Sequence, residues 1–456
     1  MNDAGAGRGE RFAEKLLSGP MKGVLGIMRR NLGAAVGLKL LSMVLQFSLF
    51  PMLIHELGKA EYGVWVVLQS TIFWFTLLDL GVGMGLRNKL IESLNLDQSQ
   101  RARGYLSSAM VGQALVWIGA SLCVGFILFG LGIEWSQWFR STTSDQALAV
   151  AIFLSFLALA WNQCLGVTNA ILIAKHWNGL TSVVSVSATL AMLFYVIAAR
   201  RLEWDLSLPR LALVNLMTYV VAHCLQAWYV FRRCPELFPR FSEYRFGVYR
   251  EVLLLGGQFL VLELTYLLIF MTDRMIALRY LGPEVATEYD IVLRFVGLVT
   301  TGYSMVIGPM WSLAGASWAK RDLVGLRMLR RIVLWVMIPF WIGAVGLALV
   351  MNEVIRRWID PTISLDRSML VLVVIYAWTV IWCGAHASLL NGIGRVREQM
   401  ICGVLACFIN VPLAIYLCGF ESLGGGGILL ASIVSLSLFG VVGPLVWRDC
   451  QRGLES

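Results

Sequence analysis

Long apolar runs alternate with short polar or basic segments over most of the chain. Within each run the apolar residues are continuous rather than alternating, which favours helices over the strands of a barrel. A membrane span needs about 20 mostly apolar residues. Twelve runs meet this length: 31–54, 62–86, 104–130, 146–172, 180–199, 210–231, 251–278, 284–312, 328–351, 367–391, 398–418 and 424–446. The pattern therefore predicts an all-α polytopic membrane protein with about twelve transmembrane helices.

The composition agrees with a membrane protein and argues against several other classes. Only 14% of the 456 residues are charged and 58% are hydrophobic, whereas soluble domains have about 25% charged residues. The net charge of +9 is spread over short segments between apolar runs, as in cytoplasmic loops, so we expect no nucleic-acid partner. Nine cysteines without a Cys-x-x-Cys pair and four scattered histidines predict neither a metal site nor a cofactor.

Lysine and arginine are distributed unequally between alternate connections. With the N-terminus inside, 25 lie in inside segments and 9 in outside loops. Because cytoplasmic loops carry the excess of basic residues, both termini are predicted to be cytoplasmic. The first 30 residues do not resemble a cleavable signal peptide. Residues 11–17 are expected to form a short interfacial helix or part of a disordered tail.

Two segments of the chain resemble each other and indicate an internal repeat. The string LGKAEYG at 57–63 is similar to LGPEVATEYD at 281–290, and AK at 174–175 corresponds to GR at 394–395. Because each half has six spans, the second half starts on the same side of the membrane as the first. The two halves therefore have the same orientation, which predicts a parallel repeat. The predicted parts are a cytoplasmic N-terminal segment 1–30, a six-helix bundle 31–231, a basic cytoplasmic linker 232–250, a second bundle 251–446 and a cytoplasmic tail 447–456.

Three basic residues lie inside the predicted spans: Lys39, Arg274 and Arg294. A charge at bilayer depth costs at least about 2.5–3.5 kcal/mol, so such a residue usually faces a partner or a wet cavity. Lys39 and Asp79 lie about equally far from the cytoplasmic side. We predict that they pair or face one cavity, and the alternative is a structural ion pair that joins two helices.

The second half also combines carboxylates with basic residues. Asp290 and Arg294 are spaced i,i+4, so they lie on one helix face and can pair. Glu263 and Asp273 lie within the preceding span. Asp290 and Arg279 could instead lie at the membrane interface with extended side chains. Arginine suits phosphate because its planar fork donates two hydrogen bonds, and cations with neighbouring carboxylates favour a pathway for an anionic headgroup.

The stretch LDLGVGMGLRNK at 78–89 carries three alternating glycines. They lack the Gly-x-Gly-x-x-Gly spacing of a nucleotide loop and follow a membrane span rather than a strand. Gly81 and Gly85 are four residues apart, so they lie on one helix face and permit close contact with another helix. Their low helix propensity also allows the end of this span to bend or unwind.

Several strings resemble polysaccharide-export flippases of the multidrug/oligosaccharidyl-lipid/polysaccharide (MOP) superfamily, over residues from about 30 to 445. They are FPMLIHELGKAEYGVWVVLQS, LLDLGVGMGLRNK, DRMIALRYLG, EYDIVLRF and LLNGIGRVREQM. The resemblance implies two six-helix bundles in a V that alternate between inward-open and outward-open states. It implies a transporter, not an enzyme, that moves undecaprenyl-diphosphate-linked oligosaccharides across a bacterial cytoplasmic (inner) membrane.

The resemblance also implies which residues bind substrate. Lys39 and Arg294 match basic residues with which such flippases hold the diphosphate in a cationic cavity, and we group Arg274 with them. Lysine at 39 offers a point charge rather than a bidentate grip. The expected partners are the lipid-linked oligosaccharide, membrane lipids and the polymerase or glycosyltransferases of the same pathway.

Other functions stay open at this stage. A cation-coupled multidrug antiporter of the same superfamily could use Asp79 and Glu263 for cationic drugs. A membrane glycosyltransferase or polymerase usually needs a large extramembrane loop, but the longest connections here have about twenty residues. A non-transporting scaffold would not depend on Lys39 or Arg294. Candidates for coupling to a proton or sodium gradient are Asp79, Glu263, Asp273 and Asp290.

Overall fold

The computed structural model describes residues 21–96, 98–175, 177–319, 321–419 and 423–455. Inside these ranges, the side chains of 21–36, of Lys39 and of a number of other residues, many of them near 90, 180, 260 and 310, lie outside the described set. The predicted interfacial helix 11–17 also lies outside it. The predicted pairing of Lys39 with Asp79 therefore stays a prediction.

All regular elements among the described residues are helices, as the apolar runs predict. The α-helices are α2 (Met21–Phe73), α3 (Val82–Asn95), α4 (Ser99–Gly130), α5 (Trp135–Phe139), α6 (Asp145–Gly166), α7 (Thr168–Ala174), α8 (Asn178–Arg201), α9 (Leu208–Arg233), α10 (Phe246–Tyr266), α11 (Thr272–Ile276), α12 (Pro283–Ala319), α13 (Leu323–Val354), α14 (Arg367–Gly392), α15 (Arg397–Cys418) and α16 (Gly425–Glu455). Short 3₁₀ segments are η1 (Trp74–Asp79), η2 (Pro235–Leu237) and η3 (Phe241–Glu243), and π-helical turns are η4 (Leu267–Met271), η5 (Ala277–Leu281) and η6 (Ile355–Ile359).

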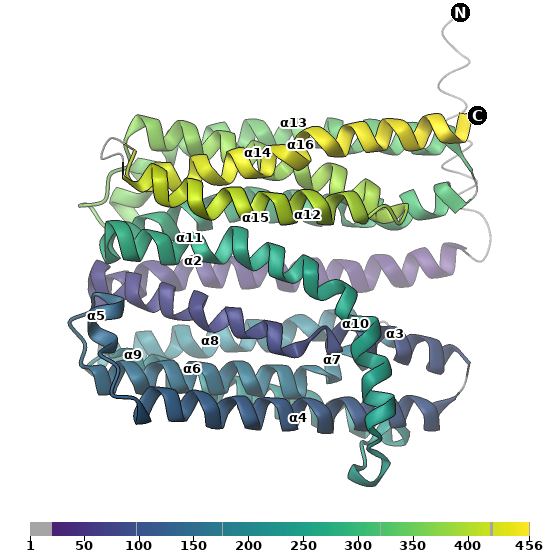
Figure 1. Cartoon of the computed structure of the whole chain (residues 1–456), viewed down its shortest axis with the longest axis horizontal. Helices are drawn as coiled ribbons and strands as arrows, with labels where there is room; N and C mark the ends of the chain where they lie inside the picture. Colours follow the sequence, from purple (N-terminus) through teal and green to yellow (C-terminus); the bar gives the residue numbers. More distant parts are fainter. Residues whose placement is uncertain (1–20, 97, 176, 320, 420–422, 456) are drawn as a thin grey trace, which may run out of the picture.

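Ten helical stretches among the described residues are long and apolar enough to cross a membrane. One of them, Leu40–Asp79, has 40 residues, which is about twice the length that one crossing needs. Gly58 interrupts its helical backbone, and Figure 1 shows that α2 turns back so that its two parts run along each other. The chain is thus an all-α membrane protein. The predicted number of spans, twelve, is larger than the number of stretches found among the described residues, ten.

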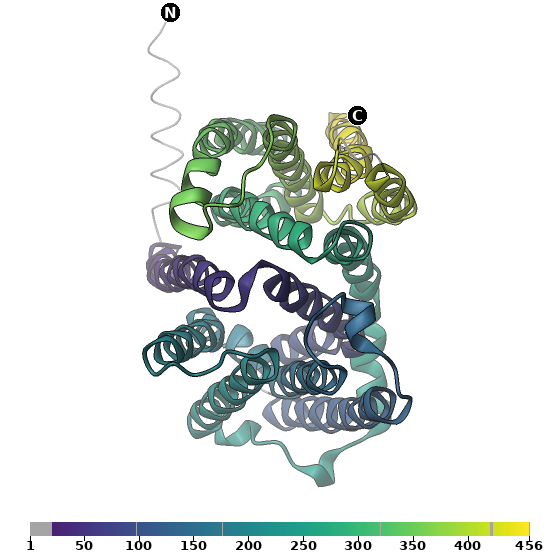
Figure 2. The ribbon, with the colours of Figure 1, turned by 90° about the vertical axis from the view of Figure 1, so that its left-hand side faces the viewer.

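The long helices lie roughly parallel to one another (Figure 1). Helices α4, α6, α8 and α9 pack against each other, and so do α12 to α16. Seen end-on, these two groups lie on opposite sides of α2 (Figure 2), which contacts both α8 and α12. Helix α2 therefore forms much of the boundary between early and late parts of the chain.

The repeated Leu-Gly strings adopt the same backbone geometry. Gly58 has φ 77° and ψ 161°, and Gly282 has φ 105° and ψ 171°. This region of backbone space is essentially restricted to glycine. Each glycine lies where one long helical segment ends and the next begins, which explains why a glycine is required in both strings.

Two glycines of the stretch 78–89 make a close helix crossing, as predicted. Leu80 and Gly81 have positive φ values of 52° and 75°, so the backbone breaks between η1 and α3. A Cβ on Gly81 would lie 2.2 Å from the carbonyl oxygen of Gly256, and one on Gly85 would lie 2.2 Å from that of Val252. Gly256 and Val252 belong to α10, which bends and crosses toward α3 (Figure 1).

The segment before α10 is also attached to α4. Backbone amides of Arg240 and Arg245 donate to the hydroxyls of Ser107 and Ser108. Arg103 forms an ion pair of 2.7 Å with Glu243. The segment 232–250, predicted as a linker, therefore packs against α4 rather than forming a loop without contacts.

Candidate functional site

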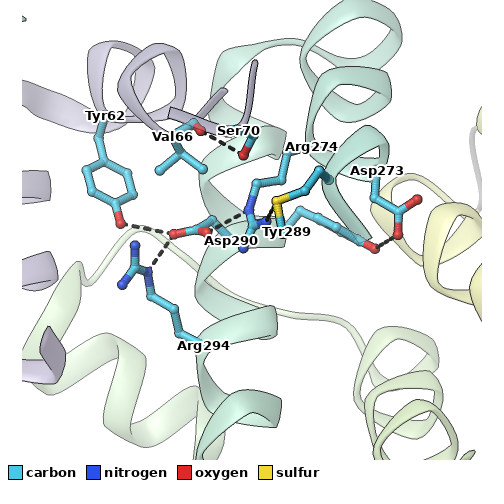
Figure 3. A network of polar contacts seen from close by, with 9 residues as sticks. Tyr62, Val66, Ser70, Asp273, Arg274, Tyr289, Asp290 and Arg294 are labelled. Carbon is cyan, nitrogen blue, oxygen red and sulfur yellow. Dashed lines mark hydrogen bonds and ion pairs between the residues drawn. The ribbon is translucent and has the colours of Figure 1, made fainter. Parts of the chain in front are cut away.

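A buried carboxylate, Asp290 in the first part of α12, is at the centre of a cluster of charged and polar side chains (Figure 3). Its side chain is 2% exposed. Oδ1 accepts a hydrogen bond of 2.9 Å from Nε of Arg274, and Oδ2 accepts one of 2.6 Å from Nε of Arg294. Oδ2 also accepts a hydrogen bond of 3.0 Å from the hydroxyl of Tyr62. We call Tyr62, Arg274, Asp290 and Arg294 the central cluster.

The local structure explains how these residues meet. Asp290 and Arg294 are one turn apart on α12, and their i,i+4 contact is the one that the spacing allows. Arg274 comes from α11, and Tyr62 comes from the second part of α2. The side chain of Asp290 does not extend to the surface, because its carboxylate is buried and paired with two guanidinium groups, and its depth in the membrane stays a prediction. Arg279 is exposed, as an interface position requires.

Arg294 also lines a cavity of about 510 Å³ between α2, α8 and α12. Its side chain is 31% exposed, and its guanidinium carbon lies 5.2 Å from the centre of the Phe50 ring, a cation–π distance. The cavity walls combine hydroxyl and amide side chains with apolar ones: Ser42, Met43, Gln46, Phe47, Ser182, Ser185, Arg294, Gly297, Leu298 and Thr301. Nε of Arg294 donates to Asp290, and the side chain of Tyr62 also approaches this guanidinium group.

Asp273 lies beside the central cluster in a group of its own. This residue is 1% exposed, and Oδ2 accepts hydrogen bonds from the hydroxyls of Tyr289 (2.8 Å) and Ser432 (2.9 Å). The side chain of Asn410 on α15 also approaches Asp273. We call Asp273, Tyr289, Asn410 and Ser432 the Asp273 cluster.

Asp79 and Glu263 lie apart from both clusters. Asp79 Oδ1 accepts a hydrogen bond of 2.9 Å from the amide of Gln113, and Oδ2 accepts one of 3.2 Å from the backbone of Gly83. Trp117 in turn donates to Gln113. Glu263 on α10 is close enough to Asp79 for their charges to interact. The structure therefore brings Asp273, Arg274, Asp290 and Arg294 together and leaves Asp79 and Glu263 at the crossing of η1, α3 and α10.

The sequence reasoning did not single out Tyr62 and Tyr289. Both stand in the repeated strings, as EY in LGKAEYG and EY in LGPEVATEYD, and each donates its hydroxyl to a buried aspartate. The sequence does contain a sign of these tyrosines, because a Glu-Tyr pair follows the Leu-Gly pair in both repeated strings. Gln113, Asn410 and Ser432 lie in ordinary apolar runs and carried no comparable signal.

Comparison with known proteins places this arrangement in a family. Residues 28–312 match the family described as "Polysaccharide biosynthesis protein". The chain belongs to this family. It is 24% identical to the "Putative O-antigen transporter" of Salmonella typhi over 397 residues, which cover 85% of this chain and 88% of that protein. It is 22% identical to the "Uncharacterized membrane protein EpsK" of Bacillus subtilis, over 90% of this chain and 80% of that one.

Solved structures show the same fold over most of the chain. An inward-facing multidrug resistance MATE family transporter of the MOP superfamily aligns with a TM-score of 0.76 at 13% identity, covering 91% of this chain and 95% of that one. An outward-facing multidrug resistance MATE family transporter of the MOP superfamily aligns with a TM-score of 0.65 at 13% identity, covering 93% of this chain and 96% of that one. The resemblance to polysaccharide-export proteins with a MOP superfamily fold, predicted from the sequence, is thus confirmed, as is the likeness to transporters rather than enzymes.

Proposed function

We propose that this protein is a flippase that moves a polyprenyl-diphosphate-linked oligosaccharide across the bacterial cytoplasmic membrane. The observation that carries the proposal is the position of Arg294. A cationic side chain lies on the wall of a cavity of about 510 Å³ that also carries hydroxyl and amide groups. A guanidinium group suits a diphosphate, and the neighbouring hydroxyls suit the hydroxyl groups of a sugar.

Arg274 and Lys39 complete the proposed anion site. Arg274 shares Asp290 with Arg294, so a diphosphate that displaces this carboxylate meets two guanidinium groups. Position 39 precedes Ser42 by three residues and Gln46 by seven on the same helix, and residues with this spacing share a helix face. We therefore propose that Lys39 adds a third cation, with Asp79 as its partner in one conformation.

The transport cycle we propose is alternating access by two six-helix bundles. The bundles are 31–231 and 251–446, related by a parallel repeat and joined by the linker 232–250, with twelve spans and both termini in the cytoplasm. The shared geometry of Gly58 and Gly282 supports the repeat. The higher TM-score with the inward-facing than with the outward-facing transporter, 0.76 against 0.65, supports a state open to the cytoplasm.

The names of the related proteins support the proposed substrate and partners. Proteins named as O-antigen transporters align over most of this chain, which supports a lipid-linked oligosaccharide as cargo. Glycosyltransferases of the same pathway then supply the substrate, and a polymerase consumes it after transport.

A complementation assay tests the proposed anion site. In a host that lacks this gene, we expect Arg294→Ala to reduce surface polysaccharide by about tenfold or more, because a charge-assisted hydrogen bond contributes about 1.5–3 kcal/mol. Arg294→Lys should restore part of the export, and Lys39→Ala should reduce it. The control is Arg279→Ala, which removes an exposed arginine at equal protein level. Normal export by Arg294→Ala would contradict the site.

The same variants separate the proposal from a multidrug antiporter. The fold alone fits both functions, because the aligned structures include multidrug transporters. For a flippase, Arg294→Ala should lower polysaccharide export and leave resistance to cationic drugs unchanged. Increased drug sensitivity in the deletion strain, with normal export, would favour the antiporter.

A further inference from the structure

A cavity of about 330 Å³ lies where the start of α13 meets the end of α16. Buried residues from these two ends, among them Leu329 and Trp447, pack in one apolar core. The cavity shares no lining residue with the one at Arg294. We call it the arginine cavity, and the described residues that line it are Arg327, Arg330, Arg331, Leu334, Trp335 and Gln451.

Two side chains of the arginine cavity hold buried nitrogen donors that have no hydrogen-bond partner among the described residues. They are Nε of Arg330 and Nε2, the amide nitrogen, of Gln451. Nε1 of Trp447, one turn before Gln451 on α16, is a third such donor. Burying a donor without an acceptor is unfavourable, because the donor has lost its contacts with water. The arginine cavity therefore lacks an acceptor that a small movement of these side chains would bring into contact.

An anionic acceptor suits the charge of this cavity. Three of its lining residues are arginines and, within the described part of the chain, none of the lining residues is acidic. The described carboxylates nearest to them in the sequence have other partners. Asp322 accepts a hydrogen bond from the backbone of Gly325, and Asp449 pairs with Arg452. Guanidinium groups bind phosphate through charge-assisted hydrogen bonds, so a phosphate group fits this set of donors.

The apolar residues of the cavity favour a lipid over a free anion. Leu334 and Trp335 lie one turn after Arg330 and Arg331, with i,i+4 spacing, so they share a helix face with the arginines. One such turn is about 6 Å along the helix. Trp335 is 66% exposed, and tryptophan is typical of the boundary between membrane and water. A charged layer followed by an apolar layer matches a lipid headgroup followed by its chain.

We infer that the arginine cavity binds the phosphate group of an anionic phospholipid. The guanidinium groups and the amide of Gln451 donate to the phosphate oxygens, and an acyl chain lies along Leu334 and Trp335. The segments 313–331 and 447–456 are both predicted to be cytoplasmic, and basic pockets between membrane helices on that side bind anionic headgroups. The bound lipid joins α13 to α16. This site does not rest on the function proposed above.

Titration of the purified protein in detergent with palmitoyl-oleoyl phosphatidylglycerol, read by native mass spectrometry, tests the inference. We expect one molecule to bind saturably. Phosphatidylcholine should bind more weakly, because its own cation balances its phosphate. Arg330→Gln should weaken phosphatidylglycerol binding by about tenfold, as expected when a hydrogen bond between charged groups is lost. Gln451→Glu should weaken it at least as much, because the new carboxylate takes the donors of the cavity and repels phosphate.

The matched control is Arg448→Gln. All three substitutions change the net charge by the same amount, but Arg448 is exposed on α16 and is not among the described residues that line the cavity. We expect this variant to bind phosphatidylglycerol as the original protein does. Size-exclusion profiles establish that each variant is intact. Gln451→Glu keeps the test valid if Arg330→Gln does not fold, because its carboxylate pairs with donors that otherwise have no partner.

Three results would overturn the inference. The first is the absence of saturable phosphatidylglycerol binding by the intact protein. The second is equal weakening in all three variants, which would mean that the lipid responds to overall charge rather than to this cavity. The third is displacement of the lipid by inorganic phosphate at equal concentration, which would assign the cavity to a soluble anion. None of these measurements depends on polysaccharide export, so failure here and failure of the proposed flippase function are distinguishable.

Discussion

Tyr62 donates its hydroxyl to Asp290, a residue 228 positions later in the chain, at 3.0 Å. This contact links the second part of α2 to α12 at a buried carboxylate that also holds two arginines. Thr287, one turn before Asp290, donates to the carbonyl of Lys59 at 2.6 Å. The two contacts fix early and late parts of the chain against each other beside the cavity.

Asp290→Asn should destabilise the protein strongly. Removing one partner of a buried ion pair costs about 3–5 kcal/mol because the remaining charges stay buried. Here two guanidinium groups lose their carboxylate. We expect a clear fall in the thermal unfolding temperature in detergent. Asp205→Asn is the control, since this carboxylate is 84% exposed beside Arg210 and an exposed pair contributes little. Equal unfolding temperatures for the two variants would contradict the role of Asp290.

Tyr62→Phe should weaken the contact between α2 and α12 without removing any packing. A hydrogen bond to a charged group contributes about 1.5–3 kcal/mol, so the unfolding temperature should fall. Tyr280→Phe, at a site that is 52% exposed, should leave it unchanged. The prediction fails if both phenylalanine variants unfold like the original protein.

Gly81→Ala and Gly83→Ala should affect stability differently although the residues are only two positions apart. A Cβ at Gly81 would lie 2.2 Å from the Gly256 carbonyl, and the residue has a positive φ. At Gly83 the nearest atom to a Cβ is the Asp79 carboxylate, at 3.6 Å, and alanine favours a helix by up to about 1 kcal/mol. Thermal unfolding should show a loss for Gly81→Ala and no loss for Gly83→Ala. A stable Gly81→Ala variant would show that α3 and α10 separate readily.

Gly63→Val should force α2 and α12 apart at the point where they pack most closely against each other. A Cβ there would lie 2.0 Å from the carbonyl oxygen of Pro283, so the helices must move apart. We expect faster amide hydrogen exchange in residues 283–290, because local opening exposes backbone amides. Gly119→Val introduces the same side chain where no atom lies within 4 Å and should leave this exchange unchanged. Unchanged exchange in Gly63→Val would mean that the packing adapts without opening.

The sequence predicted the helices well because the bilayer imposes a simple rule. A crossing segment must be apolar and satisfy its own backbone, so each predicted span corresponds to helical structure. The bend of α10 toward α3 was not predictable, because it depends on contacts between residues about 170 positions apart. The positive φ values of Gly58 and Gly282 do not follow from an apolar pattern either, because such a pattern does not specify how the chain turns between two helices.

The candidate site was predictable only where its contacts are local. Asp290 and Arg294 lie one turn apart, so helical periodicity places them together. Asn410 and Ser432 reach Asp273 through packing of α11, α15 and α16, and periodicity within one helix cannot reveal this. Asp79 shows the limit most clearly: its observed partner is Gln113, an uncharged residue on α4, and its predicted pairing with Lys39 stays a prediction.

The attachment of α10 to α3 and α4 affects how this protein can be recombined with its relatives. A chimera joined within 232–250 would pair the early helices of one protein with the α10 of another, and so mismatch the glycine crossing at Gly81 and Gly256. Moving the junction past the crossing, beyond Gly257, keeps both sides of this contact from one parent. The best junction for exchanging early and late parts of the chain therefore lies inside α10 rather than in the loop that precedes it.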